Sequence, residues 1–232
     1  MRHVVVIGAG VIGASTALRL AQRGVRVTVV DAGRVGGGTS ATSFAWIGAS
    51  HPALGPYLDL NVRGVAAWHA LAAELGGPPW LSLPGCLTWS DDPAEQSRLG
   101  ARVPELVAAG YAARVLERAE AQALEPHVDL GRTRTACLYP DEGWVDAPAM
   151  ARAVLAVAAG LGATVYEDAR VTGLLQRGDR VAGSCSPAAA STRPTSWCPA
   201  AGAGRTGSPR SPAGGCRSST SASPGRSRSG CS

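Results

Sequence analysis

The chain opens with an alternation of strand and helix that restricts it to a small set of folds. Residues Val4–Ile7 form an apolar, β-branched run, which is typical of a strand buried on both faces of a parallel sheet. Residues 14–23 then carry apolar side chains at helical spacing, and residues 25–30 form a second apolar run. A strand, a helix and a strand within about 30 residues predict a right-handed βαβ unit and an α/β fold.

Three glycines lie between the first strand and the helix, and each has a physical role. Gly8 permits a tight turn, Gly10 lets a pyrophosphate approach the backbone, and Gly13 lets the helix pack closely on the strand. The helix N-terminus supplies N–H groups and a partial positive charge for phosphates. Asp31 follows the second strand, where it could accept hydrogen bonds from a ribose diol and would repel a 2′-phosphate. The pattern predicts a dinucleotide site and disfavours NADP.

A second glycine-rich stretch follows the βαβ unit, with Gly36, Gly37 and Gly38 before Thr39 and Ser40. A nicotinamide dinucleotide needs one such turn, whereas a longer ligand extended across the sheet edge gains from a second set of backbone donors. The residues by themselves leave open the alternative that this stretch is an ordinary flexible loop.

The region that follows lacks wholly apolar strands, which places it in a different layer from the opening unit. Residues 56–75 have helical apolar spacing and end at two glycines and two prolines. The further elements that we expect are a strand at 81–89, a helix at 93–109, a short helix at 118–124 and a strand at 136–139. We expect the acidic pairs Asp91-Asp92 and Asp141-Glu142 to be solvated loop charges.

The α/β pattern returns near residue 146. Asp146 can cap a helix that has Pro148 in its first turn and that ends before Gly162. A strand at 163–166 and a hairpin made of 169–176 and 180–182 are expected to follow. The predicted domains are the first part of the nucleotide-binding domain (1–50), a partial substrate or cap region (51–146), the return segment of the nucleotide-binding domain (147–183) and a disordered tail (184–232).

Charge divides the chain at about residue 183. All 22 basic residues are Arg; residues 1–183 hold 16 of them against 17 acidic residues, and residues 184–232 hold 6 with no acid. The net charge of +5 therefore arises in the tail, so the body does not present the basic surface expected for nucleic acid. The tail also lacks Leu, Ile, Val, Met and Phe, which predicts disorder.

Other site types find little support. The cysteines have no metal-ligand spacing, Ser40 and Ser43 lie in no hydrolase motif, and no apolar run approaches the length of a membrane-spanning helix. We therefore expect no metal site and no transmembrane segment. The opening apolar run is too short for a signal peptide, and a cytoplasmic location is expected.

The motifs together resemble the D-amino acid oxidase family, which includes glycine and sarcosine oxidases. The resemblance covers residues 3–183 and implies a Rossmann-like FAD-binding domain, split by an insertion, with an incomplete α+β substrate domain. It rests on the opening fingerprint of residues 4–13 with Ala17, Leu20, Gly24, Val27, Val29 and Asp31, on the stretch 36–40, and on residues 143–148 with Gly162, Ala163 and Val171.

The resemblance implies FAD as cofactor and the oxidation of a C–N bond in an amino acid or a secondary or tertiary amine. Hydride would pass to flavin N5, the imine would be hydrolysed, and O₂ or an acceptor protein would take the electrons. An NAD-dependent dehydrogenase and a non-catalytic remnant remain as alternatives. Catalytic residues are not identified. The implied FAD-binding residues are Gly8, Ala9, Gly10, Val11, Ile12, Gly13, Asp31, Gly38, Thr39, Ser40 and Val171.

His51 follows the second glycine-rich stretch, where some amine dehydrogenases of this family tether flavin through a histidine. A loop histidine without that bond is the favoured interpretation.

The tail suggests a hypothesis about the gene. The chain is rich in Ala and contains Arg but no Lys, which suggests a gene whose third codon positions are mostly G. With such codons, residues Pro194–Cys198 are encoded by CCG ACG TCG TGG TGC. When reading starts at the third base of the Pro194 codon, the same bases encode Asp-Val-Val-Val, a sequence typical of a buried strand. A frame slip near Gly183 would thus truncate the family sequence and impair the enzyme. A natural disordered tail is the alternative, and resequencing the DNA distinguishes the two.

Overall fold

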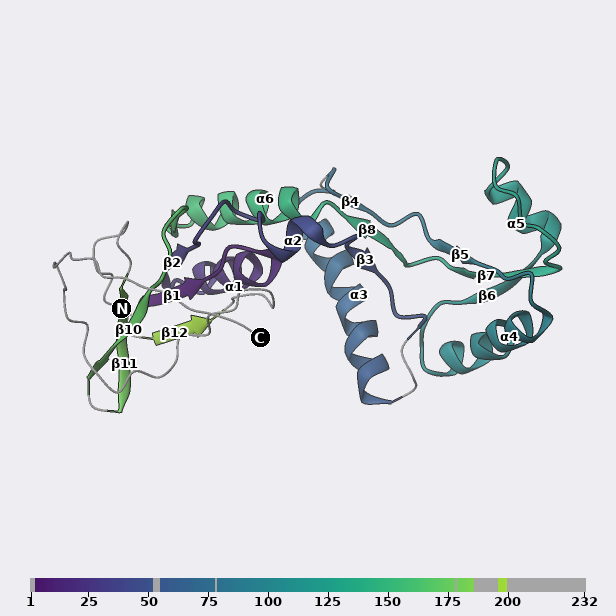
Figure 1. Ribbon diagram of the computed structural model, residues 1–232, viewed down its shortest axis with the longest axis horizontal. Helices are drawn as coiled ribbons and strands as arrows, with labels where there is room; N and C mark the ends of the chain where they lie inside the picture. The colour runs from purple at the N-terminus through teal and green to yellow at the C-terminus, as the bar shows by residue number, and fades with distance from the viewer. Residues whose placement is uncertain (1–2, 52–54, 78, 178, 186–195, 200–232) are drawn as a thin grey trace, which may run out of the picture.

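The computed structural model describes residues 3–51, 55–77, 79–177, 179–185 and 196–199. These residues form an elongated molecule (Figure 1). One end, the N-terminal lobe, is a parallel sheet with two helices. The other end, the middle lobe, is a smaller antiparallel sheet with its own helices, and a third small sheet lies between the two lobes.

The N-terminal lobe contains a four-stranded parallel sheet with strand order β12-β1-β2-β9. Strands β1 and β2 are almost wholly buried, as expected for central parallel strands. The elements of this lobe are β1 (His3–Ile7), α1 (Val11–Gln22), β2 (Arg26–Val30), α2 (Thr39–Thr42), α6 (Ala147–Gly160), β9 (Thr164–Tyr166), β10 (Gly173–Arg177), β11 (Arg180–Cys185) and β12 (Ser196–Pro199).

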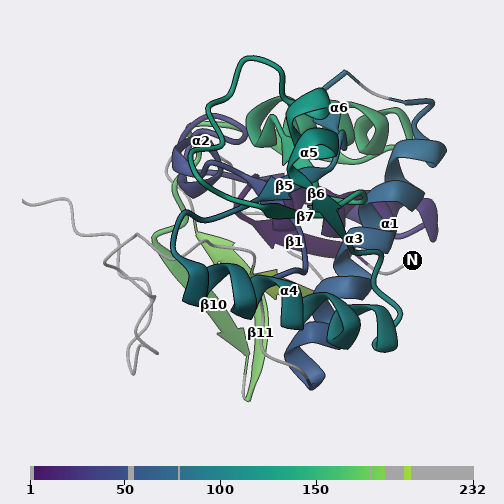
Figure 2. The same ribbon diagram turned by 90° about the vertical axis from the view of Figure 1, so that its right-hand side faces the viewer.

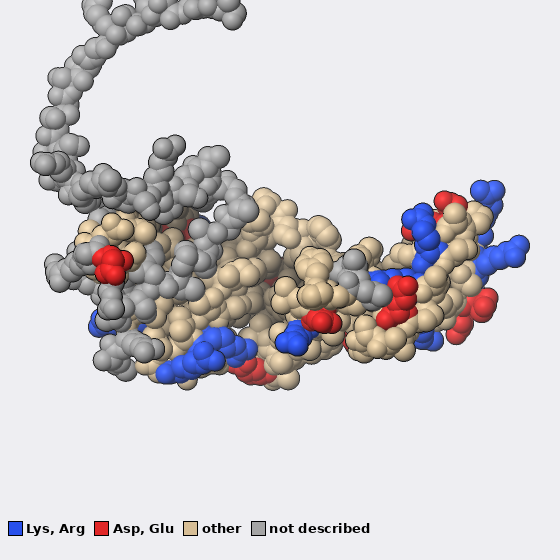
Figure 3. Space-filling view, turned by 90° about the horizontal axis from the view of Figure 1, so that it is seen from below, with Lys and Arg blue, Asp and Glu red and all other residues tan. Residues whose placement is uncertain are grey.

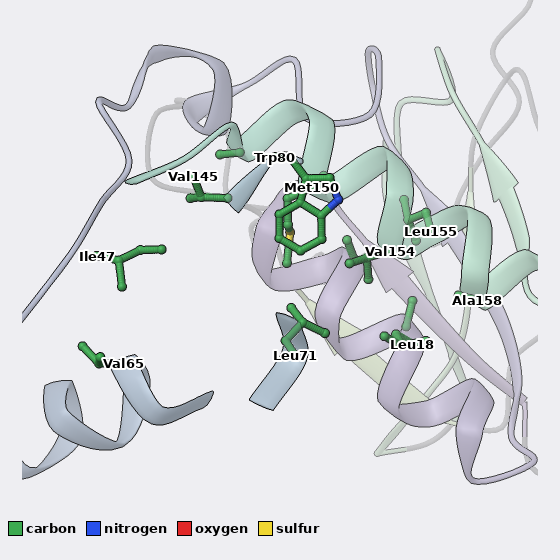
Figure 4. Packing of buried hydrophobic residues seen from close by; sticks show 14 of the residues in the cluster. Leu18, Ile47, Val65, Leu71, Trp80, Val145, Met150, Val154, Leu155 and Ala158 are labelled. Carbon is green, nitrogen blue, oxygen red and sulfur yellow. The ribbon is translucent and has the colours of Figure 1, made fainter. Parts of the chain in front are cut away.

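Helices α1 and α6 pack against each other although more than a hundred residues separate them (Figure 1). Small side chains such as Ala14 and Ala151 let the two helices approach closely. Leu18 of α1 lies near Val154 and Leu155 of α6 in the buried cluster (Figure 4). Burying each such side chain contributes roughly 1.5–3 kcal/mol. The return segment thereby packs onto the layer that the opening unit begins.

The third sheet has strand order β3-β8-β4 and joins the lobes. The middle lobe has the antiparallel sheet β5-β7-β6, and α4 and α5 cover its opposite faces (Figure 2). The elements are β3 (Trp46–Ile47), α3 (Pro56–Glu74), β4 (Leu81–Ser82), β5 (Cys86–Thr88), α4 (Pro93–Ala108), β6 (Arg114–Glu117), α5 (Arg118–Leu124), β7 (Thr135–Tyr139) and β8 (Gly143–Val145).

The expected helices are present with small shifts at their ends, but the expected strand at 81–89 is wrong. It is divided into β4 and β5, and Gly85 between them has a φ of 98° that an extended strand does not adopt. The short elements α2, β3, β6 and β8 were not expected. Strands of two to four residues are too short to show a period in the sequence.

Part of the expected disordered tail is ordered. Cys185 ends β11, and Ser196–Pro199 form β12, which pairs in parallel with Val4–Ile7 of β1. Composition failed to predict this strand because pairing with β1 is made by backbone groups, which every sequence carries. Strand β12 overlaps the residues whose assumed codons would read Asp-Val-Val-Val in the other frame. Residues 186–195 and 200–232 lie outside the described residues.

The surface mixes charges of both signs. At the end formed by α4 and α5, acidic and basic side chains lie together (Figure 3). Ion pairs such as Arg98–Glu95 and Arg102–Glu105 lie along α4. Among the helices that the structure describes, none combines the length and apolar character that a membrane crossing requires.

Candidate functional site

The first glycine-rich turn joins β1 to the N-terminus of α1. Gly8 has a φ of 102°, a conformation that favours glycine, and its N–H donates to Val30 O at 2.8 Å. Gly10 is the N-cap of α1 and provides no side chain to cap the helix. The first N–H groups of a helix have no partner within it, so this end of α1 presents donors suited to an anion. Ala9 and Gly13 are buried, whereas Ile12 is 68% exposed.

The second glycine-rich stretch folds back onto the first. The Gly36 N–H donates to Ala9 O at 3.0 Å, and the Val11 N–H donates to Ser40 Oγ at 3.3 Å. A Cβ added at Gly10 would lie 2.9 Å from Ser40 Oγ. Gly38 precedes α2, so Thr39 and Ser40 lie in its first turn. The two stretches therefore form one structured surface at the carboxyl end of β1, and the flexible-loop alternative is not supported.

Asp31 lies at the end of β2 and binds two backbone groups. Its Oδ2 accepts from the Ala9 N–H at 2.7 Å, and its Oδ1 accepts from the Gly33 N–H at 2.8 Å. A carboxylate has about four lone-pair sites, so each oxygen can accept a further hydrogen bond. The side chain thus lies beside the first turn, and its binding of a ribose diol remains a prediction.

The return segment contacts the loop after Asp31. Backbone hydrogen bonds join Asp31 N to Tyr166 O at 2.9 Å and Ala169 N to Asp31 O at 2.7 Å. Val171 is half-buried two residues beyond Ala169, and its contact with an adenine remains a prediction.

An exposed ion pair joins the same two segments. Glu167 accepts from the Val35 N–H at 2.7 Å and from Arg34 Nη1 at 3.0 Å. Both hydrogen bonds lower the pKa of Glu167, the backbone bond more than the arginine.

Comparison with known proteins gives the family of this chain. The sequence matches the family model described as "DAO: FAD dependent oxidoreductase" over residues 3–210. The chain belongs to this family. The match extends beyond residue 183, where we expected the resemblance to end. Proteins of the DAO family depend on FAD, which is the cofactor that the sequence resemblance implied.

Two curated relatives show how much of a family protein is present. Glycine oxidase of Geobacillus kaustophilus (strain HTA426) is 29% identical over 170 residues, which are 71% of this chain and 45% of the relative. The tRNA 5-methylaminomethyl-2-thiouridine biosynthesis bifunctional protein MnmC of Cupriavidus metallidurans is 34% identical over 188 residues, which are 77% and 27% of the two chains. The chain spans less than half the length of either relative.

Solved structures show the same fold. The crystal structure of glycine oxidase from Geobacillus kaustophilus matches with a TM-score of 0.73 at 27% identity, covering 88% of this chain and 56% of that one. L-Amino acid deaminase from Proteus myxofaciens matches with a TM-score of 0.78 at 21% identity, covering 87% and 46%. The second match supports the fold alone. The α/β architecture of the DAO family is therefore confirmed.

A buried carboxylate beyond the cofactor surface was not foreseen. Glu142 was expected to be solvated, yet it is fully buried. Its Oε1 accepts from the N–H groups of Ala49 and Ser50, at 3.0 and 2.9 Å, and from the Tyr111 hydroxyl at 2.9 Å. Only the adjoining Asp141 retains some exposure. A glutamate flanked by Asp and Gly carries no local signal of burial, so sequence reasoning missed it.

His51 is exposed, and its Nδ1 lies 3.0 Å from Ser50 Oγ. In the parts of the chain that the structure describes, no group of three or more His, Cys, Asp or Glu side chains could hold a metal ion.

Burial around Glu142 predicts a loss of stability in alkaline solution. Burial raises the pKa of Tyr111 and Tyr139 above the ordinary 10.0 and that of Cys86 and Cys137 above 9.0; the charge of Glu142 raises that of Tyr111 further. The folded state therefore keeps protons that the unfolded chain releases. The resulting stability is present below pH 9 and declines as the pH rises through the unfolded values and towards the folded ones.

Urea unfolding between about pH 8 and 11 measures this decline, to which each group adds at most about 1.4 kcal/mol per pH unit. The Tyr139→Phe variant should lose stability less steeply above pH 10. An identical slope in the variant would contradict the assignment.

Ala45, between α2 and β3, has a strained backbone. Its φ is 53°, although it is not a glycine, and its carbonyl accepts from the Val145 N–H at 3.1 Å. The left-handed conformation costs about 1–2 kcal/mol for a residue with a Cβ. We expect Ala45→Gly to raise the free energy of unfolding by about 0.5 kcal/mol, because the gain exceeds the added entropy of the unfolded chain.

Urea unfolding at neutral pH measures the effect of Ala45→Gly. Ala156→Gly on the exposed face of α6 is the control and should instead destabilise by about 1 kcal/mol. Equal losses in both variants would show that Ala45 is not strained.

Proposed function

We propose that this chain carries the FAD-binding part of an oxidoreductase that oxidises the C–N bond of an amino acid or of a secondary or tertiary amine. The observation that carries this proposal is the contact between the two glycine-rich stretches, through Gly36 with Ala9 and Ser40 with Val11. Family membership supports the cofactor, and a relative named glycine oxidase supports the substrate class.

The residues present suit an extended dinucleotide. The N-terminus of α1 would hold the pyrophosphate, with Gly10 leaving room for its approach. Asp31 would accept from the ribose hydroxyls, and Val171 would lie against the adenine. Gly38, Thr39 and Ser40 would supply donors towards the flavin end. When bound, FAD supplies the hydride acceptor, and the protein orients the amine beside it and excludes water.

This assignment favours FAD over NAD because a nicotinamide dinucleotide gives the second stretch no ligand to bind. The remaining alternative is a non-catalytic remnant. We propose weak or no retention of FAD by the chain as it is written. The electron acceptor would be O₂ or a protein.

A titration of the purified chain with FAD tests the function. We expect saturable quenching of flavin fluorescence and, under anaerobic conditions, bleaching of the visible flavin band by an amine or amino acid. Binding without bleaching by any amine would support the remnant. No FAD binding at any protein concentration would contradict the cofactor site. Stoichiometric FAD after gel filtration would contradict the weak retention and leave the function supported.

A further inference from the structure

Strands β3 and β8 carry two tryptophans on one face of the sheet that joins the lobes. Trp46 pairs directly with Trp144 in the antiparallel register, and directly opposed side chains lie on the same face. The two are 40% and 47% exposed, whereas Ile47 and Val145 beside them are buried on the other face. We call Trp46 and Trp144 the tryptophan pair. Its sheet lies next to α2, which follows the second glycine-rich stretch (Figure 1).

The buried carboxylate of Glu142 lies close to the indole of Trp46. Glu142 directly precedes β8 and lies two residues before Trp144. A Cβ added at Gly48 would meet Trp46 Nε1 at 2.6 Å and Glu142 Oε1 at 2.7 Å, so the indole N–H edge and the carboxylate meet in the space that a side chain at position 48 would fill. Gly48 thus lets the carboxylate lie close behind the exposed ring.

Glu142 is also incompletely satisfied. Three donors converge on Oε1, while Oε2 is buried without a hydrogen-bond partner. A buried carboxylate oxygen without a donor is costly, so nearby positive charge or an N–H donor is favoured. The indole N–H of Trp46 lies near Oε1 but makes no hydrogen bond to Oε2.

We propose that the tryptophan pair, with Glu142 behind Trp46, forms a binding surface for the ammonium group of an N-alkylated amine substrate. A cation is attracted to the face of an indole ring, and alkylammonium groups are a recurrent ligand of such surfaces. The buried negative charge adds to this attraction and opposes a carboxylate at the same position. This inference rests on the proposed function and deepens it, because it selects secondary and tertiary amines as the group bound at this face.

Indole N–H signals in NMR spectra test the surface without requiring activity. The unchanged chain is titrated with choline and, separately, with its uncharged isostere 3,3-dimethyl-1-butanol. Choline should shift the signals of Trp46 and Trp144 saturably and leave those of the core residues Trp68 and Trp80 unchanged. The uncharged isostere should bind at least about threefold more weakly.

Variants separate the two components of the surface. Trp46→Leu should weaken choline binding by about three- to fivefold, and Glu142→Gln by about threefold, since the amide loses the charge and presents a donor to the indole edge. Tyr57→Leu removes another exposed aromatic side chain, on α3, and should change nothing. If Glu142→Gln fails to fold, choline binding by Trp46→Leu alone tests the proposed surface.

Equal binding of choline by the unchanged chain and by Trp46→Leu would overturn the proposal. It would also be overturned if the unchanged chain bound the uncharged isostere as tightly as choline. A parallel FAD titration of the unchanged chain keeps the two proposals apart. FAD binding without choline binding would overturn the proposed ammonium-binding surface and leave the proposed function standing. Choline binding without FAD binding would overturn the proposed function and leave the tryptophan pair as an ammonium-binding surface.

Discussion

FAD binding is expected to fall by about 100-fold or more when Gly10 is replaced by valine, because at least two charge-assisted hydrogen bonds to the pyrophosphate are lost. A Cβ at this position already lies 2.9 Å from Ser40 Oγ, and the two methyl groups of valine would extend over the N-terminus of α1. The phosphates could then no longer approach the backbone. Fluorescence titration with FAD measures the change.

Gly64→Val is the matched control for this prediction. Gly64 lies on α3, and a Cβ added there meets nothing within 4 Å. The control should bind FAD as the unchanged chain does. Unchanged affinity in Gly10→Val would show that the first glycine-rich turn is not the phosphate site. Circular dichroism of both variants checks that the fold is retained.

The second large effect is expected at Gly36, where alanine should lower the free energy of unfolding by about 2–4 kcal/mol. Gly36 has a φ of 72°, and a Cβ there would lie 2.7 Å from the Cα of Pro148. Because that atom belongs to the backbone of α6, it cannot rotate away. The second glycine-rich stretch would be pushed from Ala9, so FAD binding should weaken as well.

Gly24→Ala separates the two causes at Gly36. Gly24 has a φ of 71°, almost the same as Gly36, but an added Cβ there meets nothing within 4 Å. In this variant the free energy of unfolding should fall only by the cost of placing a residue with a Cβ at positive φ, about 1–2 kcal/mol. The excess loss in Gly36→Ala then measures the contact with Pro148. Equal losses in the two variants would contradict a close approach of the stretch to α6.

Several elements were predictable because their information is local. The helices over 56–75 and 93–109 follow from apolar spacing and from the prolines and glycines around them, and the structure has them at Pro56–Glu74 and Pro93–Ala108. The first helix begins at Val11, earlier than the expected residue 14, because Gly10 can serve as the N-cap of the helix. Strand β3 consists of Trp46 and Ile47 only, which is too short for a recognisable period.

The residues of the candidate site also differ in whether the sequence could identify them. Gly8, Gly10, Gly13 and Asp31 could be named from the sequence, since each occupies a fixed place between one strand and one helix. Glu142 could not be named, because its partners Ala49 and Ser50 lie 93 and 92 positions away in the sequence. Tyr111, its third partner, belongs to yet another segment.

By itself, the sequence determined the opening βαβ unit, its glycine-rich turn and the interruption of the α/β pattern, because neighbouring residues decide turns, caps and apolar periods. Tertiary structure decided which distant segments meet. It brought Ser40 onto Val11, packed α6 on α1, and placed Glu142 behind Trp46. It also paired residues 196–199 with β1. These contacts depend on how the layers pack and which backbone edge is open, and no local pattern records either.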